Sequence, residues 1–381
     1  MSRLSAWSIL VIPTLLAFSL SGCKGLKGNS VGVGTSEVKT SGILNGSSSD
    51  NATGSATNST GAPNDSYFVG PISKVVMGTE HACAIYQAGG LKCWGRDDKG
   101  QLGDGNSKNS YVPVRANLGM DKVVSVSASL LFTCAIVQPQ NTTAAIDRRV
   151  RCFGNGGIGP QLGFGSTAGP YVVDKTGQPL TGALGIATGY AHACAWVNSA
   201  TSTNGVFCWG DGTGGVLGNF DPLQDGICTA GRPSSSYAVA VNYTTNFTSP
   251  ISNVMQISSG SDHTCVIAKV SSTFISVLCW GSNGQGRIIP SNATANYCSA
   301  SAIGGLSDAT TVTPVQTLAV PLGYTHTSTM RTVASKRYIY TWGTNTFGEY
   351  GNAVNFTNST AVDNFVYSAA TNYYLMPNPG D

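Results

Sequence analysis

The chain has 381 residues, a formal net charge of +3 and only 10% charged residues, well below the quarter that is usual in globular proteins. Its basic residues form no cluster, so the sequence lacks the patch typical of nucleic-acid binding and predicts no nucleic-acid partner. The 48 glycines and 11 cysteines indicate many turns and an oxidising compartment. After the first residues, no stretch is apolar and long enough to span a membrane.

Residues 1–22 have the layout of a secretory signal peptide, with one arginine, an apolar run from about Trp7 to Phe18 and small residues before Cys23. The last residues of this segment, Leu-Ser-Gly-Cys at 20–23, resemble the lipobox of bacterial lipoproteins, in which cleavage before the cysteine precedes its acylation. The resemblance implies lipidation of Cys23 and, because several acyl chains hold a protein firmly, anchoring in a bacterial outer membrane, periplasmic or surface-exposed. Ordinary secretory cleavage nearby is the alternative.

Residues 23–65 consist almost entirely of Gly, Ser, Thr, Asn and Ala and show no apolar periodicity, so we expect a disordered linker. A flexible chain of that length has an end-to-end distance of roughly 35 Å, enough to hold a domain clear of a membrane surface. Residues 66–381 are long enough to bury a large core and are expected to form one repeat domain.

One hairpin motif recurs five times in this domain. Three copies begin with His-x-Cys and end with Cys-Trp-Gly, at residues 81–95, 192–210 and 263–281, and degraded copies cover 132–154 and 326–343. An apolar strand precedes the copies, and Gln-Leu-Gly or a relative often follows, as at 101–103. Short strands with glycine at the corners and no helical periodicity predict an all-β array, for which radially repeated four-stranded blades are the fitting architecture.

The first copy resembles the repeats of the regulator of chromosome condensation family of β-propellers. These repeats contain the motifs Gly-x-x-His, Trp-Gly and Gly-Gln-Leu-Gly-x-Gly. The matching residues of this chain are Gly78, His81, Trp94, Gly95, Gly100, Gln101, Leu102, Gly103 and Gly105. Seven blades are usual in the family, whereas this chain has five Trp-Gly or Phe-Gly units, so we expect about five to six four-stranded blades. Residues 364–376, NFVYSAATNYYLM, look like two strands of a further unit and, with SYFVG at 66–70, are expected to close the ring.

Ten cysteines remain after Cys23, an even number that favours disulfides in a secreted chain. Four copies have both hairpin cysteines, while the fifth has Ser328 and Thr341 in their places. Opposed residues on antiparallel strands lie within disulfide reach, so we predict the pairs Cys83–Cys93, Cys134–Cys152, Cys194–Cys208 and Cys265–Cys279. Cys228 and Cys298 lie at matching places after Trp209 and Trp280, and we predict a disulfide between them that links adjacent blades.

We interpret the remaining side chains that could bind metal or take part in catalysis as structural, and the sequence predicts no catalytic residue, metal or cofactor. A zinc site needs four ligands and a redox centre needs Cys-x-x-Cys, and neither pattern is present. The four histidines, His81, His192, His263 and His326, recur once per copy, whereas a catalytic base needs a unique neighbourhood. We expect them to bond to local backbone; a metal-binding ring is the alternative.

Two further sets of repeated or clustered residues are also interpreted as structural. The aromatic residues before the hairpin glycine are expected to be wedges between blades rather than sugar-stacking platforms: Trp94, Phe153, Trp209, Trp280 and Trp342. Asp97, Asp98, Asp104 and the stretch from Asp211 to Asp225 lack the spacing of a calcium loop. We expect them in solvated turns.

These features together predict a monomeric, non-enzymatic binding module for an unidentified protein or glycan. The inserts around Cys228 and Cys298 are the longest in the array, and such inserts often gather on the binding face of a repeat protein, so these loops are the candidate recognition surface. The alternatives are a propeller enzyme acting on polysaccharide, which would need a carboxylate pair or a histidine base, and a secreted inhibitor of a hydrolase such as β-lactamase. The family's nuclear nucleotide-exchange activity is not expected, because a signal peptide and disulfides place the chain elsewhere.

Overall fold

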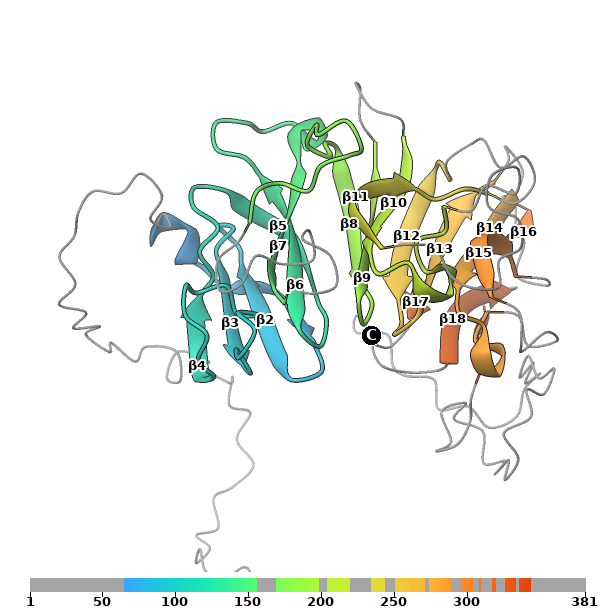
Figure 1. Cartoon of the computed structure of the whole chain (residues 1–381), viewed down its shortest axis with the longest axis horizontal. Coiled ribbons are helices and arrows are strands. Elements are labelled where there is room, and N and C mark those ends of the chain that lie inside the picture. Colours follow the sequence, from blue (N-terminus) through green and yellow to red (C-terminus); the bar gives the residue numbers. More distant parts are fainter. Residues whose placement is uncertain are drawn as a thin grey trace, which may run out of the picture. The chain divides into compact units, whose positions relative to one another are not determined.

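A computed structural model describes residues 65–155, 169–198, 204–219, 234–243, 251–270, 274–288, 296–303, 308–309, 317–319, 326–333 and 336–343 (Figure 1). The described residues form antiparallel β-sheets and short 3-10 turns, with no α-helix among them. No helix in these ranges is long and apolar enough to cross a membrane. The predicted signal peptide, nearly all of the predicted linker and the segment 364–376 lie outside the described residues.

Five sheets follow one another along the described part of the chain, and we call them blades one to five. Blade one contains β1 (Ile72–Met77), β2 (His81–Tyr86), β3 (Leu91–Gly95) and β4 (Ser110–Arg115), and blade two contains β5 (Lys122–Ala128), β6 (Phe132–Gln138) and β7 (Arg149–Gly154). Blade three contains β8 (Ala183–Thr188), β9 (His192–Val197), β10 (Gly205–Gly210) and β11 (Ser235–Ala240). Each blade is a meander in which strands that are consecutive in sequence pair with one another.

Blade four contains β12 (Val254–Ser259), β13 (His263–Lys269), β14 (Phe274–Gly281) and β15 (Tyr297–Ala302), with the short β16 (Asp308–Ala309) also pairing with β14. Blade five contains β17 (Thr317–Ala319), β18 (His326–Val333) and β19 (Lys336–Gly343). The 3-10 turns are η2 (Asp65–Phe68), η3 (Ala145–Asp147), η4 (Thr213–Gly215) and η5 (Gly284–Gly286).

The second and third strands of every blade carry the repeated hairpin in the same register. The cysteines lie directly opposite one another and form the disulfides Cys83–Cys93, Cys134–Cys152, Cys194–Cys208 and Cys265–Cys279. In blade five, Ser328 and Thr341 are the opposed pair. The disulfide-stapled hairpins that the sequence predicts are therefore present, and the fifth hairpin keeps the register without the bond.

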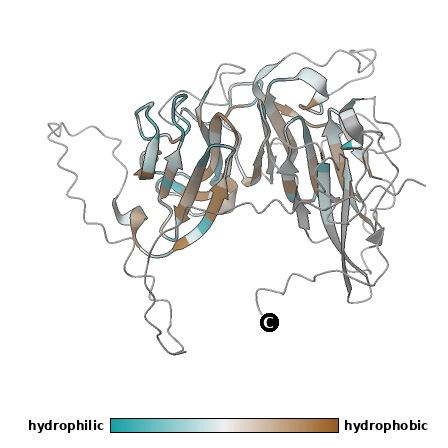
Figure 2. Cartoon of the chain, turned by 90° about the horizontal axis from the view of Figure 1, so that it is seen from below, coloured by the Kyte–Doolittle hydropathy of each residue, from teal (hydrophilic) through white to brown (hydrophobic). Residues whose placement is uncertain are grey.

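The blades pack face to face, with one hydrophobic cluster between each consecutive pair. Leu91 and Val126 belong to the cluster between blades one and two, and three further clusters lie between the later pairs. Figure 2 shows that the strands carry the hydrophobic stretches. The first strands of blades one to four, β1, β5, β8 and β12, line a shared cavity of about 340 Å³. Successive antiparallel sheets whose first strands line a common inner cavity define a β-propeller.

Residues 66–70 are not the closing strand that the sequence suggests. They begin in the 3-10 turn η2, and the Tyr67 carbonyl accepts a hydrogen bond from the Gly90 amide at 2.8 Å. The Phe68 ring meets the Tyr86 ring edge-on, with centroids 6.0 Å apart. Because the aromatic side chains of this segment pack onto the hairpin of blade one, the chain turns there instead of pairing as a strand.

Candidate functional site

In blades one and three, the glycine of the Gly-x-x-His step makes room for the imidazole ring three residues later. A Cβ atom at Gly78 would lie 2.9 Å from Cε1 of His81, and one at Gly189 would lie 2.1 Å from Cε1 of His192. Real Cβ atoms do not approach other atoms so closely, so a histidine ring in this position requires a glycine three residues before it. The repeated histidine is thus placed by its own turn.

Each of three histidines forms a hydrogen bond with a threonine of the next blade. The Nε2 atoms lie 2.7, 2.9 and 2.8 Å from hydroxyl oxygens in the pairs His81–Thr133, His192–Thr264 and His263–Thr327. Each threonine stands between the histidine position and the first cysteine position of its own repeat. The expected bond to local backbone is therefore wrong, because the bond joins neighbouring blades.

Two of the threonine hydroxyls show that Nε2 of the facing histidine carries a proton. The hydroxyl of Thr133 donates to the Gln101 carbonyl at 2.9 Å, and that of Thr327 donates to the Arg287 carbonyl at 2.9 Å. A hydroxyl has one proton, so each must accept from an imidazole N–H, which assigns the Nε2–H tautomer. Burial, the largest cause, lowers the pKa of His81 and His192 to about 4 and that of His263 to about 3. These rings are neutral struts between blades.

The contact between blades two and three replaces both partners at once. Phe132 takes the histidine position of blade two, and Ala193 takes the threonine position of blade three; both belong to one apolar cluster. Hydroxyl groups nearby supply the polar contacts, since Ser127 and Thr188 lie 2.9 Å apart and Ser129 donates to the Gly189 carbonyl at 2.9 Å. Across the contacts between neighbouring blades, a histidine in one blade therefore faces a threonine in the next, and Phe132 faces an alanine.

Four of the five repeated aromatic residues lie between blades, as the sequence suggests, whereas Trp94 of blade one is half-buried. Phe153, Trp209, Trp280 and Trp342 are all 0% exposed. The indole N–H of Trp280 donates to the Val216 carbonyl at 3.0 Å. A Cβ at Gly218 would lie 2.8 Å from that indole, and Gly218 has a φ of +63°. The last glycine of Gln-Leu-Gly and its relatives is therefore the surface on which the aromatic ring of the next blade packs.

Asp97 is a buried cap and not a solvated turn residue. It is 0% exposed, and its Oδ1 accepts a hydrogen bond from the Leu102 amide at 2.8 Å. Burial raises its pKa to about 6. Asn283 makes the matching bond to the Ile288 amide at 2.7 Å in blade four. The sequence pattern missed this role because both residues lie in Gly-rich segments that resemble turns.

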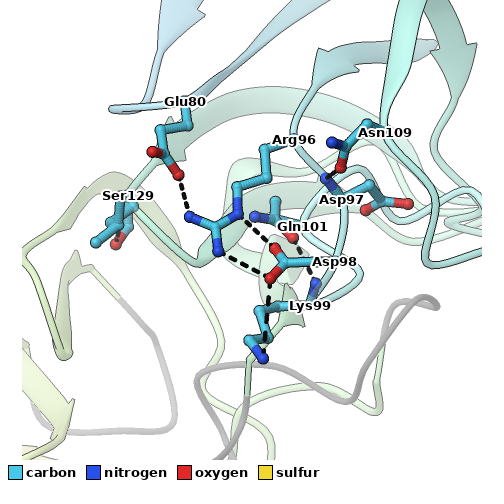
Figure 3. A network of polar contacts seen from close by, with 9 residues as sticks. Glu80, Arg96, Asp97, Asp98, Lys99, Gln101, Asn109 and Ser129 are labelled. Carbon is cyan, nitrogen blue, oxygen red and sulfur yellow. Dashed lines mark hydrogen bonds and ion pairs between the residues drawn. The ribbon is translucent and has the colours of Figure 1, made fainter.

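The turn before the histidine and the segment after Trp-Gly meet at one face of each blade. In blade one this junction is filled by ion pairs (Figure 3): Arg96 donates to Asp98 at 2.6 and 2.8 Å and also to Glu80, and Lys99 lies 3.9 Å from Asp98. The bonds from Arg96 lower the pKa of Asp98. Charged groups of both signs occupy this junction.

The corresponding junctions of blades three and four together border a pocket of about 450 Å³. Asp211 follows the Trp-Gly of blade three, Asp262 precedes His263 of blade four, and both line the pocket with Tyr190 and Asn296. The Tyr190 residue is 45% exposed. His192 lies at the wall but is buried and already bonded to the next blade. The pocket thus combines two carboxylates from adjacent blades with an accessible aromatic ring.

Local hydrogen bonds hold both carboxylates in place. Oδ1 of Asp211 accepts from the amide of Thr213 at 3.1 Å and from its hydroxyl at 2.8 Å. Asp262 accepts from the Ser261 hydroxyl at 2.6 Å and from the Arg287 guanidinium at 3.0 Å. Within the described ranges, no three His, Cys, Asp or Glu side chains gather closely enough to hold a metal ion.

The pocket lies at the base of the two inserts that the sequence selects. Asp211 and Thr213 begin the first insert and Asn296 ends the second, while residues 220–233, with Cys228, and 289–295 lie outside the described residues. A Cβ at Gly215 would lie 2.5 Å from the Cys298 sulfur, so the inserts contact each other at their bases. Cys298 is disulfide-bonded; its pairing with Cys228 stays a prediction. Lipidation of Cys23 also lies outside the described residues.

Comparisons with known proteins identify the repeats. Residues 89–136 and residues 72–101 each match the family described as "Regulator of chromosome condensation (RCC1) repeat". Residues 72–136 therefore contain RCC1-type repeats, and the described residues form an all-β propeller.

Individual relatives match parts of the chain. The Ultraviolet-B receptor UVR8 of Arabidopsis thaliana is 25% identical over 287 residues, which are 74% of this chain and 54% of that protein. The probable E3 ubiquitin-protein ligase HERC4 of Homo sapiens is 30% identical over 151 residues, 39% of this chain and 13% of the ligase. The chain thus spans about half the length of the first relative and much less of the second.

Solved structures similar to this chain include yeast RCC1 (Prp20), from a complex with Kap60, and human WBSCR16. The yeast protein has a TM-score of 0.48 at 19% identity, with coverage of 71% of this chain and 56% of that one. The human protein has a TM-score of 0.47 at 17% identity, with coverage of 67% and 57%.

Proposed function

We propose that this chain is a non-enzymatic binding module that holds a partner protein at the face where the pocket between blades three and four opens. The RCC1-type repeats support a protein-binding role at a coarse level. The observation that carries the proposal is the pocket of about 450 Å³ at the base of the inserts around Cys228 and Cys298. His81, His192, His263 and the four fully buried aromatic residues of the repeats serve the packing of the blades.

The lining chemistry favours a basic side chain of the partner. Asp211 and Asp262 present two carboxylates from different blades, and Arg287 supplies the one cation that is bonded to either of them among the described residues. An arginine or lysine entering the pocket would form charge-assisted hydrogen bonds with the carboxylates. It would also pack its cationic end against the accessible Tyr190 ring, an interaction worth roughly 0.5–2 kcal/mol.

The cell envelope is the proposed location. The lipobox at residues 20–23 supports acylation of Cys23, and the Gly- and Ser-rich segment that follows supports a tether between membrane and propeller. Replacing Cys23 by Ser in the producing cell should release the chain from the membrane fraction. If Cys23→Ser leaves membrane attachment unchanged, the anchoring part of the proposal is wrong.

A photocrosslinking experiment tests the pocket. The full chain, with a benzophenone amino acid at position 190 in place of Tyr190, is expressed in its source cell. Its crosslinking yield is compared with that of the variants Asp211→Asn, Asp262→Asn and the double variant with both changes. We expect a crosslinked partner protein whose yield falls at least about tenfold in the double variant, because the pocket loses both charges.

Asp174→Asn is the matched control. Asp174 accepts from the amide and hydroxyl of Thr176 at 2.8 and 2.7 Å, the same Asp-x-Thr arrangement as at Asp211, but it does not line the pocket. An undiminished crosslink in the double variant would place recognition elsewhere. A crosslink to polysaccharide, released by sugar and not by salt, would replace the protein partner by a glycan.

A further inference from the structure

The strands of each blade have two kinds of end. The turn before the histidine and the segment after Trp-Gly lie at the junction end, and the turn of the repeated hairpin lies at the other end, which we call the tip end. At the junction ends of blades one and two, the Thr79 amide donates to the Ser129 carbonyl at 3.2 Å. At their tip ends, the Val123 amide donates to the Gly89 carbonyl at 2.8 Å. The tip ends of these two blades therefore lie side by side, away from the junctions.

Cations gather around the aromatic side chains at the tip end of blade one. Lys92 of β3 and Arg115 of β4 are opposed by register, and both lie over the Phe68 ring. Nζ of Lys92 is 5.9 Å and the guanidinium carbon of Arg115 is 4.7 Å from the centre of that ring. Nζ of Lys122, at the start of β5, lies 5.3 Å from the centre of the Tyr67 ring. Three cations from three strands thus surround one pair of aromatic residues.

The same cluster continues into blade two. The Tyr171 hydroxyl donates to Asp121, the residue before Lys122, at 3.0 Å. The guanidinium carbon of Arg149 lies 4.7 Å from the centre of the Tyr171 ring, and Arg148 precedes it at the start of β7. We call the five cations of the two blades the basic tip surface: Lys92, Arg115, Lys122, Arg148 and Arg149.

The positive charge of the basic tip surface is largely uncompensated. The described ranges contain no carboxylate within ion-pair distance of four of its members, which are Lys92, Lys122, Arg148 and Arg149. At the junction ends, by contrast, Arg96 and Arg287 both pair with carboxylates. Like charges that are held together repel one another, so an anionic partner at the tip ends would relieve a repulsion that the fold leaves in place.

An apolar edge borders the basic tip surface. The Gln87 amide, in the hairpin turn of blade one, donates to the Pro71 carbonyl at 2.9 Å, so residues 69–72 run along this tip. Val69 is 60% exposed and Ile72 is 40% exposed. Apolar and tyrosine side chains beside cations suit the boundary between the headgroups and the acyl chains of a membrane.

We propose that the basic tip surface binds the phosphate headgroups of an anionic membrane. Lysine and arginine near such a membrane are attracted by its negative surface potential, and Val69 and Ile72 add apolar contact that a soluble polyanion would not use. The described chain also enters the propeller at this surface, through Tyr67 and Phe68. The choice of a membrane rests on the proposed location in the cell envelope, whereas the charged surface itself does not depend on that location.

Binding at the tip ends leaves the proposed partner pocket accessible. Tyr190, Asp211 and Asp262 line the pocket at the junction ends of blades three and four, so it opens at the opposite ends of the strands from the membrane. A polybasic surface combined with an acyl chain holds a protein more stably than one acyl chain does. One end of the propeller would then bind the membrane and the other the partner.

Vesicle binding by a chain without lipid tests the basic tip surface. Residues 23–381 with Cys23→Ser, the form expected after signal cleavage without acylation, are mixed with vesicles of phosphatidylcholine alone or with an equal part of phosphatidylglycerol, and cosedimentation is measured. We expect binding to the anionic vesicles only, and weaker binding at high salt. The double variant Lys92→Gln and Lys122→Gln should bind about tenfold more weakly, because two cations leave the surface.

The double variant Lys99→Gln and Lys108→Gln is the matched control. It removes the same net charge from exposed lysines near the junction end of blade one, and its affinity should change by less than about twofold, because charges far from the membrane are screened. Lys92→Arg with Lys122→Arg keeps the charge and should keep the affinity. Thermal unfolding shows whether each variant is folded.

Four results would overturn the proposal: no binding to the anionic vesicles, equal binding to both kinds of vesicle, equal losses in the two glutamine double variants, or polygalacturonate binding that displaces the chain from the vesicles. The last of these would make an acidic polysaccharide the partner. The double variant Asp211→Asn and Asp262→Asn should bind the vesicles as the unchanged chain does, so a failure of the pocket proposal stays distinguishable from a failure of this one.

Discussion

The contact between blades three and four and the contact between blades two and three perform the same task with opposite chemistry. The first buries the polar pair His192–Thr264, and the second buries Phe132 with Ala193. A buried imidazole without its hydroxyl, or a hydroxyl without its imidazole, would lose a hydrogen bond and keep the cost of desolvation. The two positions therefore change together, and the pair, rather than the single histidine, is the unit that the repeat preserves.

The largest effect should appear when acid titrates the polar contacts. The pKa of His81 and His192 is about 4 and that of His263 about 3 in the folded chain, against 6.5 for an exposed histidine. The unfolded chain binds protons below about pH 6.5, whereas the folded chain does not, so the free energy of unfolding falls as the pH drops from 6.5 towards 4. At about pH 5 each buried histidine should cost roughly 2 kcal/mol, measured by denaturant unfolding across pH.

Asp97 opposes this trend by one proton. Its pKa is raised from 3.8 to about 6, so its contribution is fully present below about pH 4 and is lost as the pH rises through 6. The net slope between pH 6.5 and 5 should therefore be less than three protons. A slope of zero, or stability that increases towards pH 5, would contradict the assignment of the histidines as neutral struts.

Exchanging one contact type for the other gives the next largest effect. Thr264→Ala leaves the His192 N–H buried without its acceptor and should cost about 1–3 kcal/mol. His192→Phe in the same chain reproduces the pairing of Phe132 with Ala193. The double variant should recover part of the loss and should also show an acid slope reduced by about one proton. Additive losses in the double variant would show that the two positions are independent.

A threonine at position 193 is the reciprocal control. Ala193→Thr adds a hydroxyl next to Phe132, where no histidine can donate to it, and should destabilise the chain. If Ala193→Thr were neutral, the match between the two positions would have no energetic basis.

Much of the fold follows from the sequence because the same residues recur at the same positions of each hairpin. The hairpin cysteines fix the register, and their joint loss at Ser328 and Thr341 identifies them as pairs. The glycine of the Gly-x-x-His step is also readable from the pattern. By contrast, the bond between His81 and Thr133 spans 52 positions, and a motif analysed one repeat at a time does not reveal a partner in the next repeat.

The candidate site was harder to predict for a related reason. The inserts around Cys228 and Cys298 belong to the two blades that border the pocket, but Tyr190 and Asp262 come from short turns before histidines. Only the packing of blade three on blade four brings these turns together with Asp211. A comparison of adjacent repeats, position by position, would have marked the two aspartates, since blade one has Glu80 and Arg96 in the corresponding places.

A smaller effect is expected where blades one and four use different caps. Asp97 and Asn283 make equivalent bonds, but only the aspartate carries a titratable group. Asp97→Asn should stabilise the chain by roughly 1 kcal/mol at about pH 8, since a buried charge is removed. It should also remove the opposing proton from the acid slope. Thermal unfolding of the variant and the unchanged chain at about pH 8 and pH 4 checks this. Asn283→Asp should have the opposite effect. A variant that is as stable as the unchanged chain at both pH values would contradict the burial argument.

Titration of the histidine rings by NMR tests the account most directly. The chain has four histidines, so their Cε1–H signals are few enough to follow individually. His81 and His263 should keep the shifts of the neutral Nε2–H tautomer, and His192 those of a neutral ring, down to about pH 5, and the three signals should change only as the chain unfolds. A midpoint near pH 6.5 for any of these three would mean an exposed, protonatable ring, and would contradict the conclusion that the repeated histidines join blades instead of acting on a ligand.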